Sequence, residues 1–158
     1  MPSSTERLAA QRDITVNRRA RHDYFIEESV EAGLVLTGSE VKALRAGKAQ
    51  LKDSYAQIKQ GELWLLNAHI SEYGPSAQFG HEPMRARKLL LHRREIDRLT
   101  GKVKEQGLTL VPLRLYFKHG RAKVELGLAR GKKLYDKRES IKERESRREM
   151  DRAMRKRQ

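Results

Sequence analysis

A cluster of three arginines near the start of the chain has the clearest chemistry. The segment Asn17-Arg-Arg-Ala-Arg-His-Asp23 places three guanidinium groups within four positions. A guanidinium group is planar and permanently charged, and its paired N–H groups match the oxygens of a phosphate. Asn17 can cap a short helix that would carry these arginines. We interpret the cluster as a phosphate clamp, and the alternative is a helix face that is only solvated.

The residue types that usually support catalysis are not arranged for it. The chain has no cysteine, which excludes thiol catalysis, disulfides and thiolate metal sites. Its histidines share no metal-ligand spacing; they are His22, His69, His81, His92 and His119. The segment Gly127-Leu-Ala-Arg-Gly-Lys-Lys133 imitates a phosphate-binding loop, but it is one residue short and lacks the Ser or Thr that would hold magnesium. We predict no catalytic residue, no metal site and no cofactor, with a small ribonuclease as the enzyme alternative.

The charge of the chain indicates a polyanionic partner. The formal net charge is +14 and the pI is about 10.3, values for which nucleic acid is the commonest partner. Residues 131–158 carry twelve basic and six acidic residues, nearly half of the excess. No apolar run reaches membrane-spanning length, and the first residues lack an apolar signal core. We therefore expect a cytoplasmic protein that does not contact a membrane.

The arginine cluster leads directly into a predicted long strand. From Tyr24 to Leu36 apolar residues occupy every second position, which predicts a strand with one buried face. Glu28 is the only charged residue on that face, and Glu31 points to the other face. We expect a bend at Gly33, where a missing Cβ tolerates a bulge. Ser39 is then the expected N-cap of a short helix.

The remaining segments predict hairpins and one further helix. Two strands should meet at Gln60-Gly61 and two more at His119-Gly120, with Pro112 at a bulge or an unpaired position. Apolar residues at helical spacing predict a helix over 92–106 that ends at Gly107. Trp64 could stack a nucleobase, but a single Trp in an apolar run favours a place in the core.

These elements amount to five or six strands and about three short helices. We predict a mainly β fold, a small antiparallel β-barrel of the oligonucleotide-binding (OB-like) kind. The expected division is a disordered lead over residues 1–13, an RNA-binding barrel domain over 14–130 and a basic tail over 131–158. The tail lacks a continuous apolar stripe but holds good i,i+4 ion pairs. We expect it to be disordered when free and helical on a polyanion; a permanently disordered tail is the alternative.

Five segments of the chain form a recognisable set of motifs. They are residues 17–28 (NRRARHDYFIEE), 31–33 (EAG), 38–48 (GSEVKALRAGK), 87–91 (RKLLL) and 127–138 (GLARGKKLYDKR). With these segments the chain resembles the family of small protein B, the SsrA-binding proteins. The match runs from about Ile14 to the end of the chain, with its motifs in order and at the expected spacings.

The resemblance implies a bacterial trans-translation factor without catalytic activity. Such proteins bind the tRNA-like domain of transfer-messenger RNA (tmRNA, or SsrA RNA). They bring alanyl-tmRNA, in complex with elongation factor Tu, to stalled ribosomes. Their tail enters the vacant decoding centre and messenger channel of the small ribosomal subunit. A ribosomal or RNA-chaperone protein with a nonspecific basic barrel is the alternative binding module.

The resemblance also implies two sets of site residues. The RNA-binding set on the barrel is Asn17, Arg19, Arg21, Glu31, Leu91 and Lys123. The ribosome-binding set in the tail is Gly131, Lys132, Tyr135, Asp136, Lys137 and Arg138. Some family members carry histidine where this chain has Tyr135, and either ring could stack on a ribosomal base. We expect Asn17 and Glu31 to be exposed and to contribute little to stability.

Overall fold

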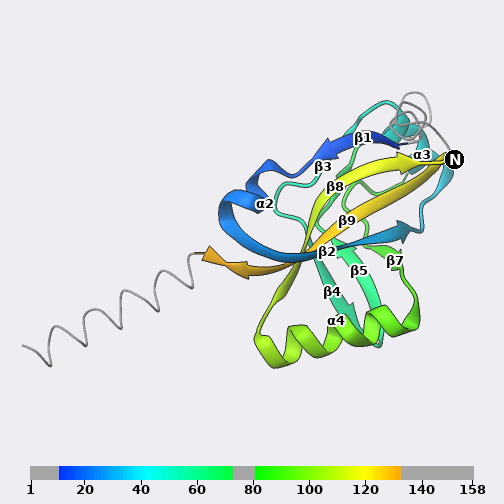
Figure 1. Ribbon diagram of the computed structural model, residues 1–158. Coiled ribbons are helices and arrows are strands. Elements are labelled where there is room, and N and C mark those ends of the chain that lie inside the picture. The colour runs from blue at the N-terminus through cyan, green and yellow to red at the C-terminus, as the bar shows by residue number, and fades with distance from the viewer. Residues whose placement is uncertain (1–10, 73–80, 133–158) are drawn as a thin grey trace, which may run out of the picture.

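The computed structural model describes residues 11–72 and 81–132, which form nine strands and three helices (Figure 1). In chain order these are β1 (Gln11–Val16), α2 (Arg18–Asp23), β2 (Tyr24–Leu34), α3 (Gly38–Arg45), β3 (Ala49–Gln50), β4 (Tyr55–Lys59), β5 (Glu62–Leu66), β6 (His69–Ile70), β7 (Arg87–Leu90), α4 (Arg93–Gln106), β8 (Thr109–Lys118) and β9 (Arg121–Gly131). The predictions for residues 1–10 and for the tail from residue 133 onward lie outside the described residues.

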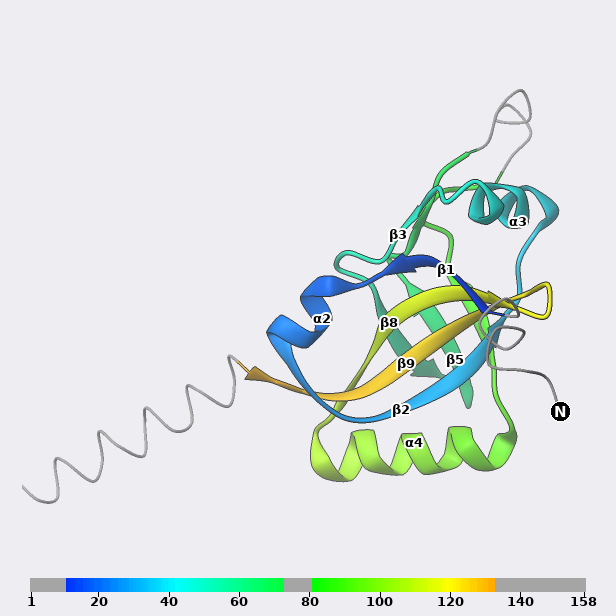
Figure 2. The same cartoon turned by 45° about the horizontal axis from the view of Figure 1, so that its top comes forward.

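The strands close into an antiparallel barrel, as the sequence predicts. The order β8-β4-β5-β7-β2-β9 returns to β8, because β8 and β9 also pair with each other. β1 pairs with the second half of β8, while β3 and β6 form a separate two-stranded sheet. The contact between β4 and β8 is a single pair, Ala56 with Leu110, and α4 lies across that end of the barrel (Figure 2). More strands form than predicted because elements of two to four residues are too short to show a period.

The long strand is present, but its bulge lies elsewhere than expected. β2 alternates between less exposed and exposed residues from Tyr24 to Ala32. The register with β9 shifts between Ile26 and Glu28, whereas Gly33 pairs regularly with Lys123. A Cβ at Gly33 would lie 3.3 Å from the Cβ of Leu90, so this glycine allows β7 to approach closely. The expected bulge at Gly33 is therefore wrong.

Glu28 has a partner that the strand pattern alone does not reveal. Its carboxylate forms ion pairs with Arg98 and Lys102, two residues of α4, the second at 2.9 Å. Hydrogen bonds from Lys102 and Arg98 lower the pKa of Glu28 below its usual value. The one charged residue on the apolar face of β2 thus serves to hold α4 against the barrel.

The short helix after β2 begins two residues earlier than expected. Thr37, and not Ser39, is the N-cap, and it forms a capping box with Glu40. Ser39 instead lies 2.9 Å from Nδ1 of His81, which is buried. Glu40 is fully buried and binds both Arg85 and Arg87. This buried cluster fixes α3 to β7.

Arg87 is the centre of that cluster. Its side chain is fully buried, and its Nε donates to Glu40. The other guanidinium nitrogens donate to the carbonyl oxygens of Ala68 at 2.6 Å and Pro83 at 3.0 Å. A buried charge is tolerated only when it is paired and hydrogen-bonded in this way.

Both predicted hairpin turns and the helix over 92–106 are confirmed. Gln60-Gly61 and His119-Gly120 have positive φ at both positions, as a two-residue type I′ turn requires. α4 ends at Gly107, whose φ of 64° is left-handed. The register of β8 with β9 shifts between Pro112 and Arg114, which confirms a bulge at the proline.

The prediction that Trp64 belongs to the core is wrong. β5 buries its neighbours Leu63 and Leu65 almost completely, and Trp64 therefore points out of the barrel. It is half-buried and belongs to neither of the two hydrophobic clusters of the described residues. An apolar run of four residues cannot by itself reveal which positions face inward.

Strands extend past both ends of the predicted barrel domain. Gln11 to Asp13 were expected in the disordered lead, but they form the first half of β1. They pair with β8, and Asp13 binds Arg114 at 2.7 Å. Their exposed polar side chains explain why the sequence shows no period there. At the other end, Gly131 is the last residue of β9 and pairs with Tyr24.

Candidate nucleic-acid interface

Asn17 attaches the start of the arginine helix to β8. It occupies the N-cap position of α2, but its side chain forms no capping hydrogen bond. Its Nδ2 donates to the carbonyl oxygen of Pro112 at 2.9 Å, and its backbone N–H donates to that of Leu113 at 2.8 Å. The bulge in β8 turns these two carbonyl groups toward Asn17. The residue is half-buried, so the expectation that it is exposed is wrong.

α2 presents its three arginines to solvent. Arg18, Arg19 and Arg21 are exposed, while Ala20 is buried against Val111, Leu113 and Ala129. Within the described residues none of the three guanidinium groups forms an ion pair. The first turn of α2 also contains no acidic residue. The charge of this helix is therefore available to an external anion.

Arg19 lies between two hollows in the surface. One, of about 310 Å³, is shared with Tyr24, Asp53 and Tyr55. The other, of about 240 Å³, is shared with Val16 and Lys52 on the facing loop. Lys52 adds a cation that the sequence motif did not suggest, because it comes from the turn between β3 and β4. The arginine cluster thus borders a recessed surface.

The start of the tail lies against the same helix. Nζ of Lys132 donates to the carbonyl oxygen of Arg21 at 3.1 Å and lies 5.0 Å from the centre of the Phe25 ring. Phe25 is 46% exposed, which leaves an aromatic surface beside these cations. We call Arg18, Arg19, Arg21 and Lys132 the helix patch. Tyr135, Asp136, Lys137 and Arg138 lie outside the described residues.

Glu31 and Lys123 belong to a second group near the other end of β2. Glu31 is exposed, as predicted, and accepts hydrogen bonds from the Tyr116 hydroxyl and, at 3.4 Å, from Nζ of Lys118. Its bond with Tyr116 holds the pKa of Glu31 below its usual value, while burial and this carboxylate raise the pKa of Tyr116. Lys123 lies beside them, opposite Tyr116 in the β8–β9 ladder. We call Glu31, Lys118 and Lys123 the strand patch.

The predicted RNA-binding residues therefore fall into two patches. Glu31 lies seven positions after Tyr24 in β2, a distance of about 23 Å along an extended strand. Leu91 belongs to neither patch, since it is half-buried and packs against the main hydrophobic cluster. Its neighbour Leu90 is 51% exposed. Sequence reasoning missed Lys118, although the turn at His119-Gly120 fixes the register that brings it to Glu31.

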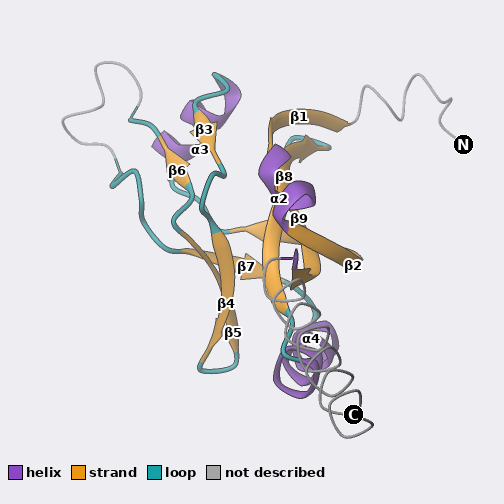
Figure 3. Ribbon diagram, turned by 90° about the vertical axis from the view of Figure 1, so that its left-hand side faces the viewer, coloured by secondary structure: helices purple, strands orange, loops and turns teal. Residues whose placement is uncertain are grey.

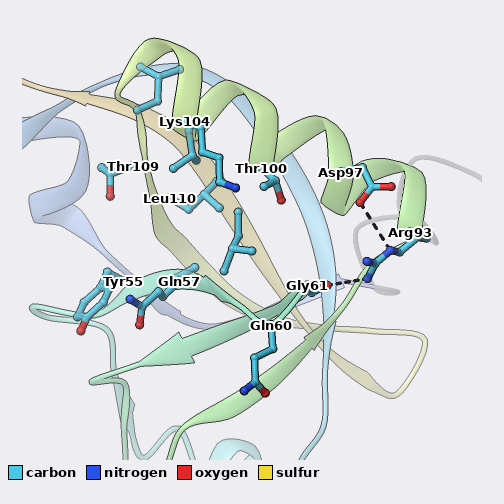
Figure 4. Close-up of a pocket in the computed structure, with 14 residues that line it drawn as sticks. Tyr55, Gln57, Gln60, Gly61, Arg93, Asp97, Thr100, Lys104, Thr109 and Leu110 are labelled. Carbon is cyan, nitrogen blue, oxygen red and sulfur yellow. Dashed lines mark hydrogen bonds and ion pairs between the residues drawn. The ribbon is translucent and has the colours of Figure 1, made fainter.

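A larger hollow than these two lies between α4 and the β4–β5 hairpin (Figure 4). It measures about 680 Å³, and Arg93 closes one end by donating to the carbonyl oxygen of Gly61 at 2.7 Å. Asp97 is the one carboxylate in its lining, and it pairs with Arg93 at 3.6 Å. Over the described ranges no group of His, Asp and Glu could hold a metal ion. No described helix is long and apolar enough to cross a membrane.

A small closed barrel with an exposed arginine helix, a basic tail and a net charge of +14 defines a nucleic-acid-binding β-barrel protein. Sequence comparison makes the class specific. The SmpB protein family model matches residues 14–156, and the chain belongs to that family.

Similar proteins cover nearly the whole chain. It is 63% identical over 145 residues to the SsrA-binding protein of Desulforudis audaxviator, covering 92% of this chain and 95% of that protein. It is 64% identical over 144 residues to the SsrA-binding protein of Thermobifida fusca, covering 91% and 90%. A solved structure described as "tmRNA-SmpB: a journey to the center of the bacterial ribosome" contains a chain of 55% identity and TM-score 0.63. That match covers 75% of this chain and 83% of the other.

Proposed function

We propose that this protein binds the tRNA-like domain of tmRNA and delivers it to stalled ribosomes for trans-translation. Family membership over residues 14–156 is the observation that carries the proposal. It is supported by relatives named SsrA-binding protein and by the similar chain from a tmRNA–SmpB study of the ribosome. The exposed and uncompensated arginines of α2 supply the phosphate-binding chemistry that such a role needs.

In this proposal the protein is an adaptor in the cytoplasm and performs no catalysis. Arg19 and Arg21 bind phosphates, and Glu31 accepts hydrogen bonds from base or ribose donors, because a carboxylate would repel phosphate. Lys123 adds a cation beside Glu31, whereas Asn17 and Leu91 act through the fold. The tail, from Gly131 and Lys132 through Tyr135 and the Asp136-Lys137-Arg138 segment, binds the decoding centre and messenger channel of the small ribosomal subunit. Elongation factor Tu joins the complex through alanyl-tmRNA.

Binding to two RNAs at two salt concentrations tests the proposal. The full-length protein should bind the tRNA-like domain of tmRNA more tightly than a duplex of the same length. Affinity should fall with salt, with a slope in log K of about −0.7 to −0.9 per phosphate contact. Equal affinity for both RNAs would favour a nonspecific RNA-binding barrel instead. Cleavage of either RNA with turnover would favour a ribonuclease.

A tagging assay tests the ribosomal half of the proposal. Purified ribosomes stalled on a message without a stop codon should add the tmRNA-encoded tag only when the protein is present. A chain that ends at Lys133 should keep its affinity for tmRNA but lose tagging. Replacement of Asp136, Lys137 and Arg138 together by alanine should reproduce most of that loss. A tail of scrambled order and unchanged composition that still supports tagging would show that the tail acts only through its charge.

A further inference from the structure

Trp64 lies on the outer face of β5 and is half-buried. Its neighbours Leu63 and Leu65 are buried to 0% and 1% exposure, so Trp64 points from the barrel toward solvent. A large aromatic ring on the outer face of a sheet contributes little to the core. Such a ring offers a flat apolar surface to a ligand.

The strand registers show which residues surround Trp64. It lies opposite Gln57 of β4 on one side and opposite Lys88 of β7 on the other. Two residues further along β7, on the same face, Leu90 lies opposite Gly33 of β2. Gly33 in turn lies opposite Lys123 of β9. The outer face therefore carries two adjacent rows, one through Trp64 and Lys88 and the next through Leu90 and Lys123.

On this face the two apolar side chains lie beside two lysines, Lys88 and Lys123, and beside the carboxylate of Glu62. Leu90 is 51% exposed, and the glycine beside it raises no side chain that would cover it. Lys88 pairs with Glu62 at 3.4 Å, and both side chains are about 40% exposed, so the pair is weak and can exchange for a phosphate. Lys123 belongs both to this face and to the strand patch, which makes the two surfaces continuous. Figure 3 shows the β4–β5 hairpin standing to one side of β8 and β9, with β7 adjoining it.

Single-stranded RNA has the chemistry that matches such a face. Unpaired bases stack on aromatic side chains, while lysines spaced along the surface bind the phosphates between them. We propose that Trp64 and Leu90 form a stacking platform that extends the strand patch and receives an unpaired base of the bound RNA. This inference rests on the proposed function, because it assumes that RNA is the partner.

The chain contains a single tryptophan, so its fluorescence reports on this site alone. Full-length protein is titrated with the tRNA-like domain of tmRNA, and binding is measured independently by the anisotropy of a dye on the RNA. Stacking should quench the tryptophan emission in step with the anisotropy. It should also protect the ring from acrylamide, a neutral quencher that RNA charge does not repel. A length-matched duplex without unpaired bases should bind more weakly and leave the emission nearly unchanged.

Substitutions separate stacking from stability. Trp64→Leu should raise the Kd for the RNA about tenfold, because stacking of one base on an aromatic ring is typically worth a change of that order. Trp64→Phe keeps an aromatic face and should stay within about threefold of the parent protein. Lys104→Ala, on exposed α4, is the control for a surface change elsewhere. The melting temperature of each variant is measured alongside.

The possible failures are distinguishable. Unchanged emission and acrylamide access at saturating RNA would overturn the platform and leave the proposed function intact. Equal quenching by the duplex would also overturn it, since no unpaired base is then needed. If ribosomal protein, and not RNA, protects Trp64 from acrylamide, the face binds a different partner and the platform is overturned. Failure of the labelled RNA to bind at all would refute the proposed function itself.

Discussion

Acid should destabilise this protein through Glu40. The carboxyl group is fully buried, and burial alone would raise its pKa. Hydrogen bonds from Arg85, the Thr37 N–H and Arg87 outweigh that effect and lower the pKa of Glu40 from 4.5 to about 2. Because the folded state holds the carboxylate in its charged form, its contribution is complete above pH 4.5 and is lost as the pH falls toward 2. At 1.36 kcal/mol per pKa unit, the loss amounts to about 3 kcal/mol.

Urea unfolding followed by circular dichroism between pH 7 and pH 2 measures this loss. Glu40→Gln should lower the unfolding free energy at pH 7 by roughly 3–5 kcal/mol, because Arg87 remains buried without its counter-charge. The variant should also lack the part of the acid dependence that Glu40 supplies. Glu105→Gln, which removes an exposed carboxylate of α4, is the matched control and should resemble the parent protein. Parallel pH curves for the Glu40→Gln variant and the parent would refute the assigned role of Glu40.

Three further predictions concern the interface. Asn17→Ala should lower the melting temperature and expose the bulge in β8, because it removes the 2.9 Å hydrogen bond from Asn17 to the carbonyl oxygen of Pro112. A variant of unchanged stability but reduced RNA affinity would instead show that Asn17 contacts the RNA. The double variant with Arg19→Ala and Arg21→Ala should reduce the slope of log K against log salt concentration by about one unit per lost phosphate contact, without changing stability. Removal of two basic residues from α4 should leave that slope unchanged. A chain ending at Arg130 should be less stable to urea than one ending at Lys132. Only the shorter chain loses the strand pairing of Gly131 with Tyr24 and the hydrogen bond from Lys132 to α2. Equal stability of the two chains would show that these contacts are dispensable.

The parts of the fold that could be predicted are those with local signals. A two-residue turn with glycine in its second position fixes a hairpin and its register without reference to the rest of the chain. This local rule accounts for both predicted turns, at Gln60-Gly61 and at His119-Gly120. The helix before Gly107 follows in the same way from apolar spacing and a left-handed C-terminal glycine. The alternation along β2 could also be predicted, because a strand of eleven residues is long enough to show its period clearly.

The errors have a common physical origin in contacts between distant elements. The partners of Glu28 and the outward position of Trp64 could not be predicted, because their surroundings come from α4 and β7, which follow later in the chain. The buried pair of Glu40 and Arg87 joins residues 47 positions apart, and nothing in either local sequence marks it. Asn17 occupies the predicted N-cap position, but its side chain donates to a carbonyl group 95 positions away. The arginine cluster, by contrast, was located correctly because exposure is the default for a charged residue on a short helix.

The two patches are linked by β2 and β9, which form one of the two longest ladders of the barrel. β2 and β9 pair along nine positions from Tyr24 to Gly33, and these are the strands that carry Lys123 and lead into Lys132. The helix patch and the start of the tail therefore sit at one end of a stiff two-stranded ribbon, with the strand patch about 23 Å away. A flexible connection would let RNA binding and tail position vary independently. In this barrel the hydrogen-bonded ladder between β2 and β9 fixes the distance between them, so an RNA held at both patches also determines where the tail begins.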